Sequence, residues 1–402
     1  MAELLAPAGT FEKMETAFRF GADAVYFAGK KFGLRAFAGN FSDNEILEAT
    51  TYAHNLGKRV YITINILAHE GDFIGLKEYL DELVKAKVDA VIVSDLGIIE
   101  FIKENAPSLT IHVSTQANIL NSYAINFMYK MGVKRVILAR ELSIEEIKQI
   151  RKRIPKDLEL ESFVHGAMCI SYSGRCLLSN YLTGRDANRG ACTQPCRWEY
   201  TITEKSRKGE EYEIQEDDRG TYILNSKDMM MIDHLKELED AGVTSFKIEG
   251  RMKSPYYVAN VVNAYRYALD NMNTLKEKDF DMLKKELCKT SHRKYTTGFY
   301  FGAKDKEYLE SSMPVQTSEF MASVLADGDG EKVLIEQRNR FKVGDTLEVL
   351  SPNKDIFNKT ILIEKMTNEN GEDIFDAKDV QQKIYLYTPL KLQKGDILRK
   401  EI

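Results

Sequence analysis

The sequence predicts an α/β protein: a (β/α)8 barrel of the TIM type with a cysteine-rich insertion after strand 7, plus a small C-terminal all-β domain. Eight short apolar runs recur through the first two thirds of the 402 residues. Amphipathic, helix-like stretches separate most of these runs, as expected for parallel strands buried on both faces. From about Pro314 onward, short alternating runs separated by turn residues predict the β-domain.

The eight apolar runs are the predicted barrel strands. In chain order they are ELLAP (3–7), ADAVYFAG (22–29), KRVYITIN (58–65), VDAVIVSD (88–95), TIHVST (110–115), KRVILAR (134–140), LELESFVHG (158–166) and TSFKIEG (244–250). Several intervening helical stretches end on a glycine just before the next run, as in FGAD, LGKR, MGVK and AGVT. A count of eight favours a closed barrel, and an open doubly wound sheet is the alternative.

The domain boundaries follow from this pattern. The barrel domain is expected over residues 1–275, with the insertion at 166–220 between strands 7 and 8. A linker helix and connection should occupy 276–313, and the small β-barrel domain 314–402. Loops after barrel strands lie on the catalytic face, so the insertion should cover the mouth of the barrel.

The composition bounds the cellular setting. Hydrophobic residues make up 44% of the chain and charged residues 29%, and no apolar run approaches the roughly 20 residues that span a bilayer. The first residues, MAELLAPAGT, do not resemble a secretory signal, so a cytoplasmic protein without a membrane partner is expected. The formal net charge of −5 means that a nucleic-acid partner would need a local basic patch.

Four of the five cysteines fall in the insertion, with the spacing C-x6-C-x15-C-x3-C: Cys169, Cys176, Cys192 and Cys196. Disulfides are rare in the cytoplasm, so clustered cysteines indicate metal binding or redox chemistry. The first pair is wide for a zinc knuckle, whereas a meandering loop suits an iron–sulfur cluster. Iron–sulfur and zinc therefore both stay open, with unliganded cysteines as a third interpretation. Cys288, in a charged helix, is expected to be a packing residue.

Polar residues close the apolar runs and should converge on the barrel mouth. His165 could act as an acid or base because its charge changes near neutral pH. Arginine binds carboxylates in a bidentate fork, so Arg140, Lys247 and Arg251 are candidates for holding a carboxylate-bearing molecule. Strand-end solvation and ordinary salt bridges are the alternative for any single residue. The expected catalytic residues are His165, Glu141, Glu249 and Arg251. The expected substrate-binding residues are Tyr26, Asn65, Ser114, Gln116, Arg140, Lys247, Arg185 and Arg189.

The insertion is locally basic. Between Gly166 and Lys208 there are seven basic and three acidic residues, a balance of +4 in a chain of −5. Tyr172, Tyr181 and Trp198 are interleaved with the cations. Aromatic rings can stack on unpaired bases and cations can meet phosphates, which favours RNA binding. A solvated loop with structural aromatics explains the same residues without RNA.

ESFVHGAMCISYSGRCLLSN (161–180) resembles the signature of peptidase family U32, the collagenase-like peptidases. Further motifs agree along the whole chain: LLAPAG, LRAFAGNF (34–41), HVSTQANI, RG-C-x-QPCR, NSKDM (225–229) and KIEGRMKS (247–254). The resemblance, closest to the prephenate-dependent tRNA uridine 5-hydroxylases, implies oxygen-independent hydroxylation of wobble uridine 34 in the tRNA anticodon loop. It further implies prephenate, a small dicarboxylate, as co-substrate and a 4Fe-4S cluster on the four clustered cysteines.

Two alternative functions remain. The family name implies proteolysis, but the sequence contains neither G-x-S-x-G nor H-E-x-x-H. A non-catalytic scaffold with a structural zinc is the other. A homo-oligomer or a paralogous partner subunit is also compatible with the sequence.

Overall fold

The structure is a computed structural model that describes residues 2–33, 40–169, 171–198, 216–217, 220–221, 227–302 and 315–402. The described residues form two compact units. One draws on 1–14, 23–252 and 293–314, and the other on 15–22, 253–292 and 315–402. No helix in the described ranges has the length and apolar character needed to cross a membrane.

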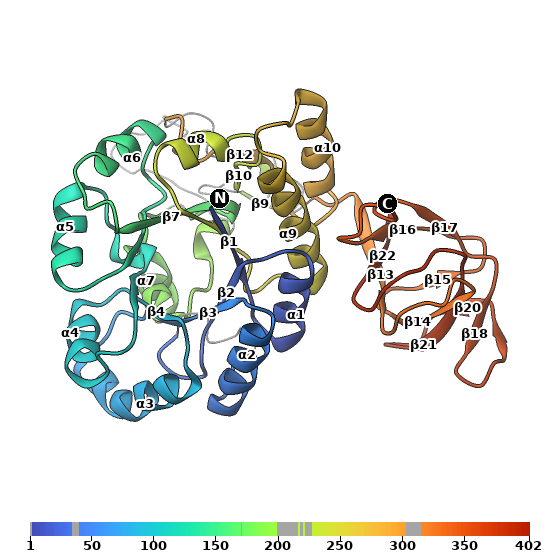
Figure 1. Cartoon of the computed structure of the whole chain (residues 1–402), viewed down its shortest axis with the longest axis horizontal. Coiled ribbons are helices and arrows are strands. Elements are labelled where there is room, and N and C mark those ends of the chain that lie inside the picture. Colours follow the sequence, from blue (N-terminus) through green and yellow to red (C-terminus); the bar gives the residue numbers. More distant parts are fainter. Residues whose placement is uncertain are drawn as a thin grey trace. The chain divides into compact units, whose positions relative to one another are not determined.

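Eight parallel strands close into a barrel (Figure 1). β11 pairs with β1 on one side and with β7 on the other, which completes the ring. The strands are β1 (Glu3–Pro7), β2 (Ala24–Phe27), β3 (Arg59–Ile64), β4 (Ala90–Val93), β5 (Ile111–Val113), β6 (Arg135–Ile137), β7 (Glu159–Ala167) and β11 (Ser245–Ile248). Each coincides with one of the eight predicted runs, with only Ala167 of β7 outside them, so the closed barrel is confirmed over the open sheet.

Helices lie between successive barrel strands and two more follow the last strand, β11, and local sequence signals explain where several of them begin. Capping boxes start two of the helices, one between Ser42 and Glu45 and one between Ser143 and Glu146. The side chain of Asp95 caps a third. The helices are α1 (Phe11–Arg19), α2 (Asp43–Asn55), α3 (Leu76–Ala86), α4 (Leu96–Asn105), α5 (Ser122–Lys130), α6 (Ile144–Arg151), α8 (Leu235–Asp240), α9 (Pro255–Asp270) and α10 (Glu277–Leu287).

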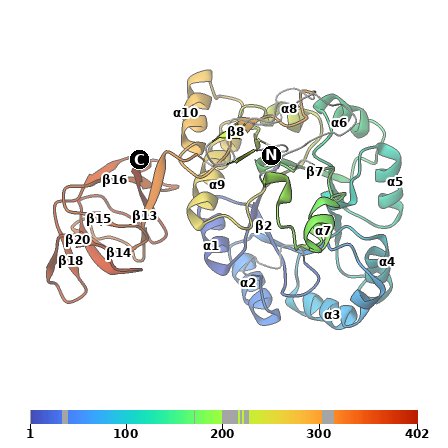
Figure 2. The ribbon, with the colours of Figure 1, turned by 180° about the vertical axis from the view of Figure 1, so that it is seen from behind.

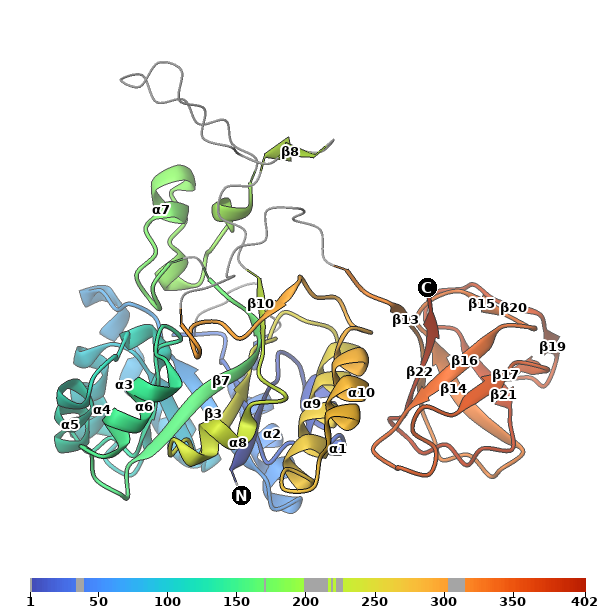
Figure 3. The same cartoon turned by 90° about the horizontal axis from the view of Figure 1, so that it is seen from above.

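The chain leaves the barrel after β7 and returns at β11. The excursion contains α7 (Leu178–Thr183), η3 (Ala187–Arg189), η4 (Pro195–Arg197) and the short pair β8 (Glu216–Asp217) and β9 (Gly220–Thr221). Figure 3 shows α7 beyond the carboxyl ends of the strands, and in the reverse view of Figure 2 it lies in front of them. We call the described residues 171–198 the lid.

Two further strands extend the barrel sheet. β10 (Asp228–Met230) pairs antiparallel with β7, and β12 (Tyr295–Thr296) pairs with β10. β12 lies in the stretch that the sequence analysis assigned to the connection between the domains. Residues that follow α10 therefore contribute to the sheet that carries the barrel.

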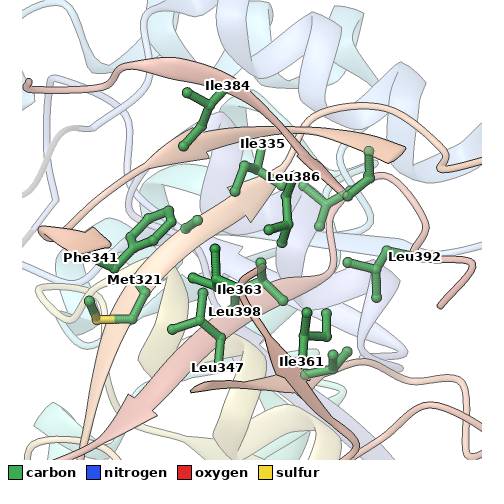
Figure 4. Close-up of a cluster of buried hydrophobic side chains, with 14 of the residues drawn as sticks. Met321, Ile335, Phe341, Leu347, Ile361, Ile363, Ile384, Leu386, Leu392 and Leu398 are labelled. Carbon is green, nitrogen blue, oxygen red and sulfur yellow. The ribbon is translucent and has the colours of Figure 1, made fainter. Parts of the chain in front are cut away.

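The C-terminal residues form the predicted all-β domain. Its main sheet has the strand order β17-β16-β22-β13-β14-β21-β18-β19, and β15 pairs with β20. Figure 4 shows its core, in which Met321, Ile335 and Phe341 are buried with other apolar side chains. The strands are β13 (Ser318–Val324), β14 (Lys332–Gln337), β15 (Phe341–Lys342), β16 (Thr346–Leu350), β17 (Thr360–Leu362), β18 (Met366–Asn368), β19 (Asp373–Ile374), β20 (Asp376–Ala377), β21 (Lys383–Tyr387) and β22 (Ile397–Glu401).

Candidate active site

A buried ionic network fills the part of the barrel where the strands begin. Arg135 donates to Oε1 of Glu3 at 2.6 Å and to Oε2 of Glu161 at 3.0 Å, while the hydroxyl of Tyr61 donates to Glu3 at 2.7 Å. Burial alone would raise the pKa of Glu3, but Arg135, Arg59 and the Tyr61 hydroxyl together outweigh it and hold that pKa below its ordinary value. The network therefore places paired charges inside the barrel at the end where the strands begin.

Lys247 belongs to this interior network. Its ammonium lies 2.8 Å from Oε1 of Glu161, a carboxylate with no exposed surface, and 4.3 Å from the centre of the Tyr26 ring. The sequence analysis placed Lys247 among the cations of the mouth. The structure instead buries it one residue before the end of β11, where a carboxylate and an aromatic face already surround its charge.

Arg251 follows β11 at the carboxyl end of the barrel, as predicted, and is buried. The side chain is 4% exposed, and its guanidinium donates to Oδ1 of Asn40 at 2.9 Å and to Oγ1 of Thr63 at 3.4 Å. Burial strengthens the attraction between a guanidinium and an anionic ligand, because a low dielectric screens it less than water would. Asn40 and Thr63 were not anticipated from the sequence.

Tyr26 and Glu249 meet near Arg251. The Tyr26 hydroxyl donates to the backbone oxygen of Ile248 at 3.0 Å and lies 3.5 Å from Oε2 of Glu249. Glu249 is partly exposed, whereas Tyr26 is buried. Two residues that lie more than two hundred positions apart in the chain therefore meet at the carboxyl ends of the barrel strands.

His165 is buried on β7, with 1% of its surface exposed. Its backbone oxygen accepts a hydrogen bond from the Glu249 amide at 2.9 Å, and its ring centre lies 5.4 Å from that of Tyr295. Gly166 follows with φ of +107°, and a β-carbon there would come within 2.6 Å of the Glu249 oxygen. Glycine at 166 thus allows β7 and the end of β11 to approach closely. Tyr295, on β12, is a site neighbour that the sequence analysis missed.

The lid is fastened to the barrel at several points around the mouth. Glu141 accepts from the Ser173 amide at 2.9 Å and from the Ser173 hydroxyl at 3.2 and 3.3 Å. A β-carbon on Gly174 would come within 2.0 Å of the Gln116 oxygen, so the lid backbone lies directly against this residue of η2 (Thr115–Ala117). Both carboxylate oxygens of Glu141, which was expected to be catalytic, are therefore hydrogen-bonded to the lid in this structure.

A bidentate ion pair makes the third fastening. The Arg189 guanidinium donates to both oxygens of Asp72 at 2.7 and 2.9 Å, and to the backbone oxygen of Leu67 at 2.7 Å. The hydrogen bond from Arg189 lowers the pKa of Asp72 below its ordinary value. Arg189 was expected to contact RNA, but its guanidinium is already engaged by the connection that follows β3.

The remaining predicted site residues are spread around the mouth. Arg140 donates to the Ala167 oxygen at 2.9 Å, and the buried Ser114 accepts from the Gln116 amide. Asn65 is partly exposed, and Arg185 is exposed. The side chain of Asp95 caps the N-terminus of α4. Tyr172, Tyr181 and Trp198 are 62%, 80% and 42% exposed, as an RNA-stacking surface requires. The predicted cations Lys205, Arg207 and Lys208, and most of LRAFAGNF, lie outside the described residues.

None of the four clustered cysteines is disulfide-bonded: Cys169, Cys176, Cys192 and Cys196. Cys169 and Cys192 are exposed, and the other two are partly exposed. Four thiols in a loop with almost no apolar core match the donor chemistry of a four-thiolate metal centre. Across the described residues, however, no three His, Cys, Asp or Glu side chains are gathered as a preformed metal site. The donors fit such a group, and binding it would have to draw the thiols together.

Comparison with known proteins shows relatives along the whole chain. The tRNA hydroxylation protein P1 of Bacillus subtilis is 39% identical over 99% of this chain and 94% of the relative, and the tRNA hydroxylation protein P of Escherichia coli is 37% identical over 97% and 94%. An uncharacterized protease of Methanocaldococcus jannaschii is 46% identical over 75% of this chain and 73% of its own length.

Family models account for both parts of the chain. The model of peptidase family U32 matches residues 9–310, and that of the U32 C-terminal domain matches residues 316–399. These matches confirm the resemblance that the motifs indicated. The chain belongs to peptidase family U32.

Proposed function

We propose that this chain is an enzyme that hydroxylates tRNA. The observation that carries the proposal is similarity over nearly the full length to two proteins named for tRNA hydroxylation. The barrel mouth supports it, because a lid with exposed aromatic side chains lies beyond the carboxyl ends of the strands, where Tyr26, Glu249 and Arg251 are found. Unpaired bases of an RNA loop can stack on such aromatic rings.

The finer proposal concerns the substrate position and the co-substrate. The target is C5 of the wobble uridine at position 34, and prephenate is the co-substrate. Arg251 is the group best suited to a prephenate carboxylate, since it is a buried guanidinium at the carboxyl end of the barrel, oriented by hydrogen bonds to Asn40 and Thr63. Glu249 and His165 lie on the same rim and are placed to exchange protons with bound substrate.

The cofactor proposal rests on the lid. Cys169, Cys176, Cys192 and Cys196 would hold a 4Fe-4S cluster, and zinc is the alternative metal. A bound cluster of this kind supplies one-electron transfer. Glu141 and Arg189 fasten the segment that carries three of the four thiols, so they position the cysteines over the mouth.

Nucleoside analysis of tRNA tests the function. In an organism with no second family member, deletion of the gene should remove 5-hydroxyuridine-type nucleosides from the wobble position, and the wild-type gene should restore them. Unchanged wobble nucleosides in the deletion strain would overturn the proposal. Cleavage of peptides by the pure protein, abolished by substitution of Arg251 or Glu249, would put a peptidase in its place.

A further inference from the structure

The outer flank of the barrel carries a cationic surface remote from the lid. It is formed by the end of α5, the start of the run that leads into β6, and the turn after α6. Five exposed side chains build it, and we call them the α5–α6 basic face: Lys130, Lys134, Lys152, Arg153 and Lys156.

Two tertiary hydrogen bonds hold the segments of this face together. The Asn126 side chain donates to the Arg153 backbone oxygen at 3.0 Å, and the Tyr129 hydroxyl donates to Asp157 at 2.8 Å. The last turn of α5 and the turn after α6 are thereby joined. Cations from two separate stretches of sequence consequently share one surface.

The cations of the face have no carboxylate partner among the described residues. No residue of the α5–α6 basic face forms an ion pair there, whereas Lys77 and Lys85 on α3 pair with Asp81 and Glu82. The carboxylates beside the face have other partners: Asp157 is bonded to Tyr129, and Glu159, whose amide donates to the Lys134 oxygen, is paired with Arg135. Unpaired cations concentrated in a chain of net charge −5 repel one another, so this surface gains most from a polyanionic partner.

Two exposed aromatic side chains continue the surface along α5. Tyr123 and Phe127 are 84% and 52% exposed, and their spacing with Lys130 puts all three on one stripe of the helix. α5 follows the carboxyl end of β5 and ends where β6 begins. The stripe thus runs from the mouth end of the barrel, at Tyr123, to the opposite end, at Lys130 and the basic face.

We propose that this flank is a second tRNA-binding surface, on which the phosphate backbone of the tRNA body lies while the anticodon loop enters the mouth. The inference rests on the proposed function, because it takes tRNA as the polyanion. Lysine and arginine contacts to phosphates release counterions and supply affinity without reading sequence. The flank therefore selects a whole tRNA over an isolated anticodon stem-loop.

Charge reversal tests the inference. Lys152→Glu with Lys156→Glu is compared with Lys77→Glu and Lys85→Glu, which changes the net charge equally on α3. Binding to an unmodified tRNA transcript and to its anticodon stem-loop alone is measured for both double variants. The flank variant should bind whole tRNA about tenfold more weakly, with a salt slope reduced by about two, and should bind the stem-loop within about twofold of wild type. The α3 variant should match wild type on both RNAs.

Three outcomes would overturn the inference. The flank variant could bind whole tRNA as tightly as wild type, it could lose affinity for the stem-loop equally, or the α3 variant could lose as much. Matching Gln variants at 152 and 156 separate charge from folding, because Gln has the size of Glu without its charge, and they should give a smaller loss in the same direction. The protein could bind tRNA through this flank although deletion of its gene leaves the wobble nucleosides unchanged. That result would overturn the proposed function and leave this inference standing.

Discussion

The guanidinium of Arg189 meets the carboxylate of Asp72 in a bidentate pair, with N–O distances of 2.7 and 2.9 Å. This pair joins the lid to the connection after β3, more than one hundred residues earlier in the chain. Planar, two-bond geometry gives such a pair more specificity than a lysine contact can supply. The lid is thus docked on the barrel by defined contacts, although it contains little apolar core.

Replacing Arg189 with Ala should loosen the lid without unfolding the barrel. Alkylation of Cys176, measured by mass spectrometry on the metal-free protein, should become several-fold faster, because this thiol is partly exposed and its backbone is bonded to Asn188 next to Arg189. The alkylation rate of Arg189→Lys should fall between those of wild type and Arg189→Ala, since an ammonium cannot reproduce the bidentate contact. Equal alkylation rates in Asp72→Asn and wild type would show that the pair does not hold the lid.

The four clustered cysteines should each be needed for iron, and the fifth should not. Protein purified without oxygen should be brown and carry about four irons per chain, as a 4Fe-4S cluster requires. Serine at 169, 176, 192 or 196 should remove most of the iron and the visible absorption. Cys288→Ser is the matched control, because that thiol is partly buried outside the lid and should leave both unchanged. Colourless wild-type protein with stoichiometric zinc after reconstitution would contradict the cluster assignment.

Arg251→Ala should abolish hydroxylation while the protein stays folded. Its guanidinium donates to Asn40 and Thr63, so its removal leaves the buried Glu3–Arg135–Glu161 network intact. If it binds a carboxylate of the co-substrate, Arg251→Lys should retain some turnover with a raised KM for prephenate. Unchanged kinetics in Arg251→Ala, at an unchanged melting temperature, would rule out this role.

Glu3→Gln should destabilise the barrel at neutral pH. Breaking a buried ion pair costs about 3 kcal/mol, because Arg135 then keeps one fewer negative partner. The pKa of Glu3 is lowered in the folded state from an ordinary value of 4.5, so its stabilising effect is present above that value and is lost as pH falls through the folded-state pKa. Thermal unfolding should therefore show a gap between wild type and Glu3→Gln that narrows below about pH 4.5. The exposed Glu78→Gln serves as control, and a gap of the same size in acid would contradict the assignment.

The sequence predicted the barrel because strand and helix periodicities are local signals. All eight strands and the position of the lid between β7 and β11 follow from runs that can be read without distant contacts. The strand-end rule also placed Tyr26, Glu249 and Arg251 at one rim.

Pairings across the fold could not be predicted in the same way. The sequence around Lys247 does not indicate that its ammonium would form a buried ion pair with Glu161 on β7. The sequence around Glu141 does not indicate that its carboxylate would accept hydrogen bonds from Ser173. Tyr295 reaches His165 only because β12 joins the barrel sheet through β10. Polar residue types were visible in the sequence, but their partners depend on contacts between segments far apart in the chain.

Reconstituting the reaction tests the proposed tRNA hydroxylation directly. Purified protein loaded with iron and sulfide would be incubated without oxygen with prephenate and a tRNA transcript carrying uridine at the wobble position, and the nucleosides analysed by mass spectrometry. We expect that uridine to gain one oxygen atom only when prephenate is present. The gain should be lost in the Cys176→Ser variant and absent from a transcript that carries cytidine at the wobble position. An unmodified wobble uridine with fully loaded protein, under conditions in which the tRNA is bound, would contradict the proposal.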